Sequence, residues 1–223
     1  MMESKNFIFE KIKNERPPVH TTPKGEFRCV GLGTESLEFI FNNMQPGSVT
    51  LETGCGLSTL VFGLTGCHHT AIVPNKSHIQ ETIKSAEKLG VSLDYVTFIP
   101  QRSETYLPTL SSAQKLDAIL IDGGHAFPIP MIDWYYTQKQ LKKSGILIVD
   151  DVHLKTVSIL YEFLKRQPEW QEIRQHQKTV FFQKNEESGH DNEWDFWRSQ
   201  PYNTNFRAKF SQLLTSIKAR LKN

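Results

Sequence analysis

The sequence contains few cysteines, and none of them is spaced for a shared role. The three are Cys29, Cys55 and Cys67, and no two of them form a CxxC pair. An odd number without such a pair argues against a disulfide framework and against a zinc site. Reduced cysteines are typical of the cytoplasm, so we expect a cytoplasmic protein.

Long apolar runs and an excess of one charge sign are also missing. No stretch approaches the roughly 20 apolar residues of a membrane span, and Glu3, Lys5 and Asn6 interrupt the N-terminus where a signal peptide has its apolar core. The 26 basic and 24 acidic residues give a net charge of +2. We therefore expect no membrane span, no signal peptide and no nucleic acid as a general partner.

The composition that is present fits a globular protein, with 38% hydrophobic and 22% charged residues. Residues 1–28 are polar and proline-containing, which predicts an N-terminal arm with a short helix at 4–15. We expect residues 29–184 to form one domain. Residues 185–223 predict a polar linker and an amphipathic helix, which we expect to dock on the domain or on a second copy of the chain, so a homodimer is left open.

Short apolar segments alternate with helical periodicities through the central part of the chain. The strands are expected at 48–52, 70–73, 94–99, 118–121, 146–149, 170–175 and 179–183, with helices at 34–44, 57–64, 77–89, 130–143 and 154–164. This alternation predicts an α/β, Rossmann-like, doubly wound fold. We expect a mostly parallel seven-stranded sheet with an antiparallel C-terminal strand and helices on both faces.

Two of the apolar strands end on acidic residues. Residues 118–121 are followed by Asp122, and residues 146–149 by Asp150 and Asp151. A crossover between parallel strands places both ends at the carboxyl edge of the sheet, where open α/β sheets bind ligands. Three carboxylates there repel one another, so they suggest a cation, a bound polar ligand or proton transfer. The simpler alternative is that they are solvated strand-end or helix-capping acids.

The segment between these two strands carries His125 and Asp133. Its helix is expected to begin near Pro130 and to end with the two lysines before Gly145. Asp133 is expected to face solvent or to cap a turn. His125 is either a loop residue with local hydrogen bonds or a group that takes part in chemistry near neutral pH.

A glycine-containing turn, Glu52-Thr53-Gly54-Cys55-Gly56, follows the first expected strand of the sheet and precedes a helix. Its glycines allow close approach of the backbone to a ligand, and the helix N-terminus offers free N–H donors. The turn matches neither GxGxxG nor a P-loop, which argues against dinucleotide binding and phosphoryl transfer. The alternative is a tight turn without a ligand. Cys55 is expected to pack at this turn rather than to act as a nucleophile.

Two motifs resemble a known family. VTLETGCGLSTLVFG resembles the first motif of class I S-adenosylmethionine (SAM)-dependent methyltransferases. LDAILIDGGHAFPIPMIDWYYTQKQLKKSGILIVDDV resembles the fourth and fifth strand motifs of their O-methyltransferase branch, especially the macrocin-type sugar methyltransferases. The two motifs span residues 48–152. The resemblance implies a SAM-dependent enzyme that methylates a hydroxyl of a small molecule, such as a sugar or a natural product.

The resemblance also implies roles for individual residues. In the cofactor site, the glycine turn would lie along the methionine part of SAM, with Ser58 in place of a frequent third glycine, and Ser103 would lie beside the adenine. The implied cofactor-binding residues are Glu52, Gly54, Cys55, Gly56, Ser58, Asn75, Ser103 and Asp122.

Metal-dependent members of this branch imply a second set of roles. Asp122, Asp150 and Asp151 match positions that hold a divalent cation, usually Mg²⁺, and His125 matches the position of a general base, with Asp122 beside it as the second catalytic residue. A hard dication prefers such carboxylate oxygens and would lower the pKa of a bound hydroxyl. A histidine can take the released proton near neutral pH.

One position departs from the family pattern. Val73 stands where these enzymes usually have an acid that binds the ribose hydroxyls, and Asn75 is the nearest polar substitute. The alternative is therefore a non-catalytic SAM- or nucleotide-binding or scaffold module on the same fold. A nucleotide-binding oxidoreductase is a weaker alternative, because both the glycine spacing and the acid are missing.

Overall fold

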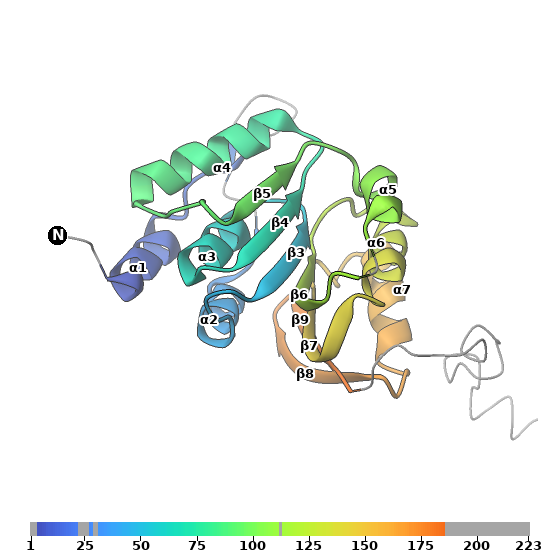
Figure 1. The fold of residues 1–223 in the computed structure, drawn as a ribbon. Helices are drawn as coiled ribbons and strands as arrows, with labels where there is room; N and C mark the ends of the chain where they lie inside the picture. The colour runs from blue at the N-terminus through green and yellow to red at the C-terminus, as the bar shows by residue number, and fades with distance from the viewer. Residues whose placement is uncertain (1–3, 22–26, 29–30, 112, 186–223) are drawn as a thin grey trace, which may run out of the picture.

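The computed structural model describes residues 4–21, 27–28, 31–111 and 113–185 of the chain. Its centre is a seven-stranded sheet in the order β5-β4-β3-β6-β7-β9-β8 (Figure 1). The strands are β3 (Val49–Thr53), β4 (His68–Ile72), β5 (Val96–Ile99), β6 (Leu116–Ile121), β7 (Leu141–Val149), β8 (Trp170–His176) and β9 (Thr179–Lys184). The first five are parallel, and β9 lies antiparallel between β7 and β8. The predicted α/β fold is confirmed.

Helices cover both faces of this sheet (Figure 1). One face packs on α1 (Lys5–Glu15), α2 (Thr34–Asn43), α3 (Leu57–Thr65) and α4 (Lys76–Leu89), and the other on α6 (Ile129–Thr137) and α7 (Lys155–Leu164), with α5 (Ser103–Tyr106) and the 3₁₀ turn η1 (Leu107–Thr109) beside them. The alternation of β6 explains the two layers: Ala118 and Leu120 enter the first core, and Ile119 and Ile121 the second.

The N-terminal segment contributes to the first core. Ser4 caps α1 by accepting a hydrogen bond from the backbone N–H of Phe7. Ile8, Phe9 and Ile12 of α1 are buried, and the ring of Phe9 stacks on that of Phe41 at 4.1 Å. The helix predicted at residues 4–15 is therefore present and packs on the domain. A short ribbon of β1 (His20–Thr21) and β2 (Phe27–Arg28) follows it.

The expected boundary between the sixth helix and the next strand is wrong. Helix α6 ends at Thr137, and β7 begins at Leu141, so the two lysines and Gly145 lie in the strand. Leu141 is buried and pairs with Leu116 across a register shift. Lys142 points to the surface, where its Nζ lies 2.6 Å from Asp117. Long-range pairing thus overrides a local pattern that is typical of a helix end.

The polar linker and amphipathic helix predicted at 185–223 lie outside the described residues, apart from Asn185, and stay predictions, as does the homodimer. Among the described residues, no helix has the length and apolar character needed to cross a bilayer.

Candidate functional site

The turn after β3 touches the end of β6. Gly54 has φ +112°, a conformation that residues with a Cβ rarely adopt. Its N–H donates to the carbonyl of Ile72 at 2.9 Å, and a Cβ built on it would lie 2.6 Å from the backbone oxygen of Asp122. The glycine turn and the acidic strand end therefore share one rim of the sheet.

A cavity of about 460 Å³ opens at this rim, a size typical of small-molecule sites. It is lined by the glycine turn, the ends of β4 and β6, the start of α5, and the loop before β9. Of the expected site residues, those that line it are Gly54, Cys55, Asn75, Ser103, Asp122, His125 and Asp151. Glu52, Gly56, Ser58 and Asp150 do not line it.

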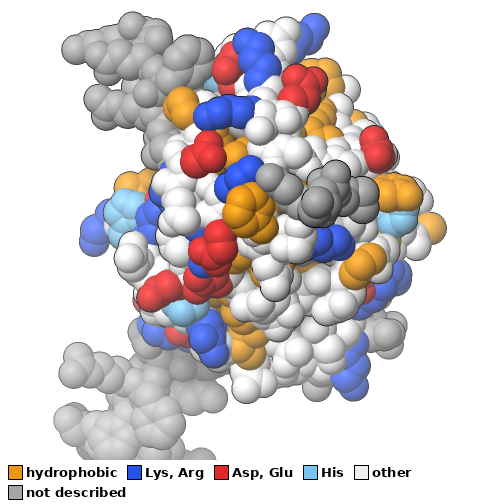
Figure 2. Space-filling view, turned by 90° about the vertical axis from the view of Figure 1, so that its left-hand side faces the viewer, with side chains coloured by type: hydrophobic (Ala, Val, Ile, Leu, Met, Phe, Trp, Pro, Cys, Tyr) orange, Lys and Arg blue, Asp and Glu red, His pale blue; other side chains and the backbone are white. Residues whose placement is uncertain are grey.

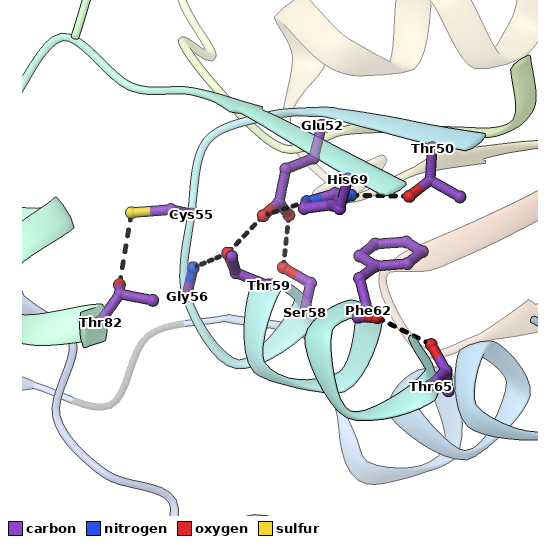
Figure 3. A network of polar contacts seen from close by, with 10 residues as sticks. All are labelled: Thr50, Glu52, Cys55, Gly56, Ser58, Thr59, Phe62, Thr65, His69 and Thr82. Atoms are coloured by element: carbon purple, nitrogen blue, oxygen red, sulfur yellow. Dashed lines mark hydrogen bonds and ion pairs between the residues drawn. The ribbon is translucent and has the colours of Figure 1, made fainter. Parts of the chain in front are cut away.

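Glu52 lies beneath the turn rather than in the cavity (Figure 3). Its carboxylate accepts a hydrogen bond from Ser58 Oγ at 2.6 Å and another from Thr59 Oγ1, and His69 Nε2 lies 3.0 Å away. The Gly56 N–H in turn donates to Thr59 Oγ1 at 2.9 Å. Alternation along β3 directs Glu52 to the face covered by α3. These residues hold the turn in place from behind.

His69 completes this buried group. Its Nδ1 lies 2.8 Å from Thr50 Oγ1, and its ring stacks on Phe62 at 4.4 Å. The preceding residue, His68, is exposed. Adjacent side chains of a strand point to opposite faces of the sheet, and of the two adjacent histidines only His69 is buried. His69 is thus a structural partner of Glu52.

Cys55 packs at the edge of the cavity, as expected. Thr82 Oγ1 donates to its sulfur at 3.5 Å (Figure 3). Burial raises the pKa of the Cys55 thiol to about 12. At neutral pH the sulfur is therefore a thiol, which is a poor nucleophile.

The acidic strand ends converge on a histidine. His125 Nε2 lies 3.2 Å from Asp151 Oδ2 and 3.7 Å from Asp122 Oδ1. One ligand-type atom of each of these three residues lies within 4.8 Å of the others. The close approach of Asp122, His125 and Asp151 agrees with the prediction that parallel strands would bring their acids together.

The surroundings of Asp122 and His125 raise the pKa values of both groups. Burial raises the pKa of Asp122 to about 7, although interaction with His125 opposes the rise. The Asp122 carboxylate is the largest cause that raises the pKa of His125, burial works against it, and the charge of Asp151 adds to the rise. Asp122 can thus change protonation near neutral pH, as acid–base chemistry requires, and the pKa of His125 lies above its ordinary value.

Asp150 departs from the expected arrangement. Its side chain is fully buried, accepts a hydrogen bond from Thr179 Oγ1 at 2.5 Å, and lies 3.0 Å from Lys178 Nζ. The same ammonium lies 2.7 Å from Asp151 Oδ1. The three predicted metal ligands therefore do not gather around one point, because the side chain of Asp150 turns toward β9. Lys178, which sequence reasoning missed, lines the cavity instead.

Asp133 is a second residue that sequence reasoning placed incorrectly. It is fully buried on α6, and neither carboxylate oxygen has a well-formed hydrogen bond among the described residues. Burial raises the pKa of Asp133 to about 6, and the hydroxyls of Ser103 and Thr53 oppose the rise. Both of those hydroxyl residues line the cavity. A buried carboxylate thus stands directly behind the cavity wall.

Comparison with known proteins places this site in context. Residues 51–152 match a protein-family model described as a methyltransferase domain. No curated protein sequence matches the chain. Among solved structures, cofactor-bound Rv0187 from MTB is similar with a TM-score of 0.61 and 12% identity over 83% of this chain and 91% of that one.

Two further solved structures are similar. The O-methyltransferase TomG from Streptomyces achromogenes, involved in tomaymycin synthesis and in complex with SAM, has a TM-score of 0.59 and 14% identity, covering 83% of this chain and 91% of that chain. The precorrin-6y C5,15-methyltransferase from Geobacter metallireducens has a TM-score of 0.54 and 15% identity, covering 77% and 94%. At these identities the likeness shows a common fold. The family match covers the glycine turn, both acidic strand ends and the residues that line the cavity, apart from Gly31 and Lys178.

Proposed function

We propose, from the methyltransferase domain matched by residues 51–152, that this protein is a SAM-dependent methyltransferase that transfers a methyl group to a hydroxyl of a small molecule. The observation that carries the proposal is the contact between Gly54 and the end of β6, which brings a glycine turn and an acid–base group to one cavity. A cofactor and an acceptor bound there would be held within reach of His125.

The cofactor part of the proposal rests on the glycine turn. Gly54 presents backbone without a side chain to the cavity, and Ser103 and Val73 line the part that would hold the adenosine. Asn75 is a poorer ribose ligand than its position suggests, because its Oδ1 already caps α4 by accepting a hydrogen bond from the Ser77 N–H at 2.9 Å. The ribose would therefore have fewer acceptors than an acid at Val73 would supply.

The chemical part of the proposal rests on His125. An acceptor hydroxyl must lose its proton as it attacks the methyl group of the sulfonium, and His125 is the group placed to take that proton. Asp151 and Asp122 orient the imidazole and stabilise its charged form. The remaining contribution is positioning of the two reactants, which reaches about 7–11 kcal/mol in well-oriented systems.

A small-molecule acceptor fits the cavity, and the described residues on the face seen in Figure 2 form no basic stripe that would favour a nucleic acid there. On the face seen in Figure 2, basic and acidic side chains of the described residues are interspersed rather than gathered into a basic stripe. Nucleic-acid binding depends on clustered Lys and Arg that neutralise phosphates. The cavity at the rim of the sheet, by contrast, has a volume typical of small-molecule sites.

The second candidate is a non-catalytic SAM-binding or scaffold module, favoured by Val73 and by the capping role of Asn75. Calorimetric titration with SAM and with its demethylated product tests the cofactor claim. We expect saturable binding of both, and no binding of either at millimolar concentration would refute the proposal. Transfer of a labelled methyl group to a panel of hydroxylated acceptors then separates the candidates, because only an enzyme loses transfer in His125→Gln while keeping its affinity for SAM.

A further inference from the structure

We infer that Lys178 supplies the positive charge at the acidic end of the cavity, in place of the divalent cation that the resemblance implies. The ammonium group lies 2.7 Å from Asp151 Oδ1 and 3.0 Å from Asp150 Oδ2. It therefore bridges the two acids that follow β7. The inference deepens the proposed function and rests on it for the meaning of the site.

Each carboxylate oxygen of Asp150 and Asp151 lies near a hydroxyl, ammonium or imidazole group, although neither Asp150 Oδ2 nor His125 Nε2 has a well-formed hydrogen bond among the described residues. Asp150 is fully buried, with one oxygen bound to Thr179 Oγ1 and the other beside Lys178. Asp151 has one oxygen beside Lys178 and the other 3.2 Å from His125 Nε2. Of the three expected ligands, only Asp122 keeps a carboxylate that faces the cavity without an ammonium partner. Ligand-type atoms of Asp122, His125 and Asp151 still lie within 4.8 Å of one another, but the Lys178 ammonium on the same Asp151 carboxylate repels a dication, and Mg²⁺ prefers more oxygen ligands than these residues offer.

The position of Lys178 is fixed by the backbone around it. Its carbonyl oxygen accepts a hydrogen bond from the Val152 N–H at 3.0 Å, which ties the turn before β9 to the end of β7. The preceding residue, Gln177, has φ +50°, and the following one, Thr179, donates to Asp150. The side chain is half-buried and lines the cavity. The turn before β9 therefore fixes the position of the Lys178 backbone, whereas a lysine on an open surface is free to move.

The consequence for the reaction concerns His125. The ammonium group lies 2.7 Å from one oxygen of Asp151, and the other oxygen of the same carboxylate lies 3.2 Å from the imidazole of His125, so Lys178 helps to fix the carboxylate that faces His125. Lys178 also offsets the repulsion among Asp122, Asp150 and Asp151. It acts as a positioning residue, and no metal is required to hold the acids together.

Metal binding measured without SAM or acceptor tests this inference. Mn²⁺ serves as the probe, because its electron paramagnetic resonance signal distinguishes free from bound ion. We expect the wild-type protein to bind Mn²⁺ no more tightly than millimolar. In Lys178→Gln the acids lose their counter-charge, and the affinity for Mn²⁺ should rise by about tenfold or more, the scale on which neighbouring groups tune metal sites.

Two control variants sharpen the result. Lys178→Arg keeps the charge and should not gain affinity. Lys142→Gln removes another lysine in an ion pair, with Asp117 at the opposite edge of the sheet, and should not gain it either. Micromolar Mn²⁺ binding by the wild type, or no gain in a folded Lys178→Gln, would overturn the inference. Because this measurement needs no SAM, a failure of SAM binding would refute the proposed function alone.

Discussion

A Cβ atom on Gly54 would lie 2.6 Å from the backbone oxygen of Asp122, so the turn after β3 and the end of β6 are in direct contact. The Asp122 N–H also donates to the Thr53 carbonyl at 3.1 Å, which continues the parallel pairing up to the turn. The site depends on this contact, because any side chain at Gly54 would push the two strand ends apart.

Gly54→Ala should therefore lower both stability and cofactor affinity. A positive φ alone costs a residue with a Cβ about 1–2 kcal/mol, and the clash with Asp122 adds to that cost. Gly47→Ala is the matched control, because Gly47 also has a positive φ of +84° but nothing within 4 Å of a built Cβ. Urea denaturation and calorimetry with SAM measure the two effects. Equal SAM affinity in the two variants would show that the contact does not shape the site.

The arrangement of the strands could be predicted because it follows from local patterns. Apolar runs at 118–121 and 146–149 gave the strands, and parallel connection gave the convergence of Asp122 and Asp151. The end of α6 could not be predicted in this way. It depends on the pairing of Leu141 with Leu116, which are 25 residues apart, while the intervening lysines and glycine match a helix end equally well.

The site residues also fall into two groups, those placed by the local strand pattern and those placed by long-range packing. Gly54, His125 and Asp151 lie at a strand end or in the loop that follows one, so the fold class alone places them at the cavity. Lys178 reaches the cavity through the β8–β9 turn, and the packing of α6 places Asp133 behind the cavity wall; no spacing in the sequence reveals either position. The directions of the Glu52 and Asp150 side chains depend on which face of the sheet each enters, and a family motif does not specify that.

His125→Gln should lower kcat by about 10² to 10⁴, the usual contribution of a general base. Its SAM affinity should stay close to that of the wild type, because the cofactor is expected at Gly54.

In the wild type, kcat should fall as the pH drops through the pKa of His125, which lies above the ordinary histidine value. Asp122→Asn removes the largest cause of that rise, so it should move the acidic limb to lower pH. An unmoved limb would assign it to another group.

Glu52→Gln should weaken the turn without touching the cavity. The carboxylate accepts hydrogen bonds from Ser58 and Thr59 and pairs with His69, and an amide directs its N–H group at one of these donors. A buried group left unsatisfied costs about 1–3 kcal/mol. Urea denaturation should show this loss, while Glu87→Gln on the exposed side of α4 should change stability little. An unchanged stability in Glu52→Gln would mean that the group is solvated or rearranges freely.

Asp133→Asn should make the protein more stable at alkaline pH. The pKa of Asp133 is raised from 3.8 to about 6 in the folded chain, so the folded state binds more protons than the unfolded state between these values. The free energy of unfolding therefore falls as pH rises through this window, by about 3 kcal/mol for a shift of roughly two units. Asparagine carries no charge and escapes that cost.

The advantage of Asp133→Asn over the wild type should thus be absent near pH 4 and complete at pH 8, as measured by urea denaturation at each pH. Asp94→Asn, which changes an exposed carboxylate, should show no such difference. If Asp133→Asn is instead less stable at pH 8, the ionised carboxylate has a stabilising partner behind the cavity wall, and the hydroxyls of Ser103 and Thr53 are the first places to look for it.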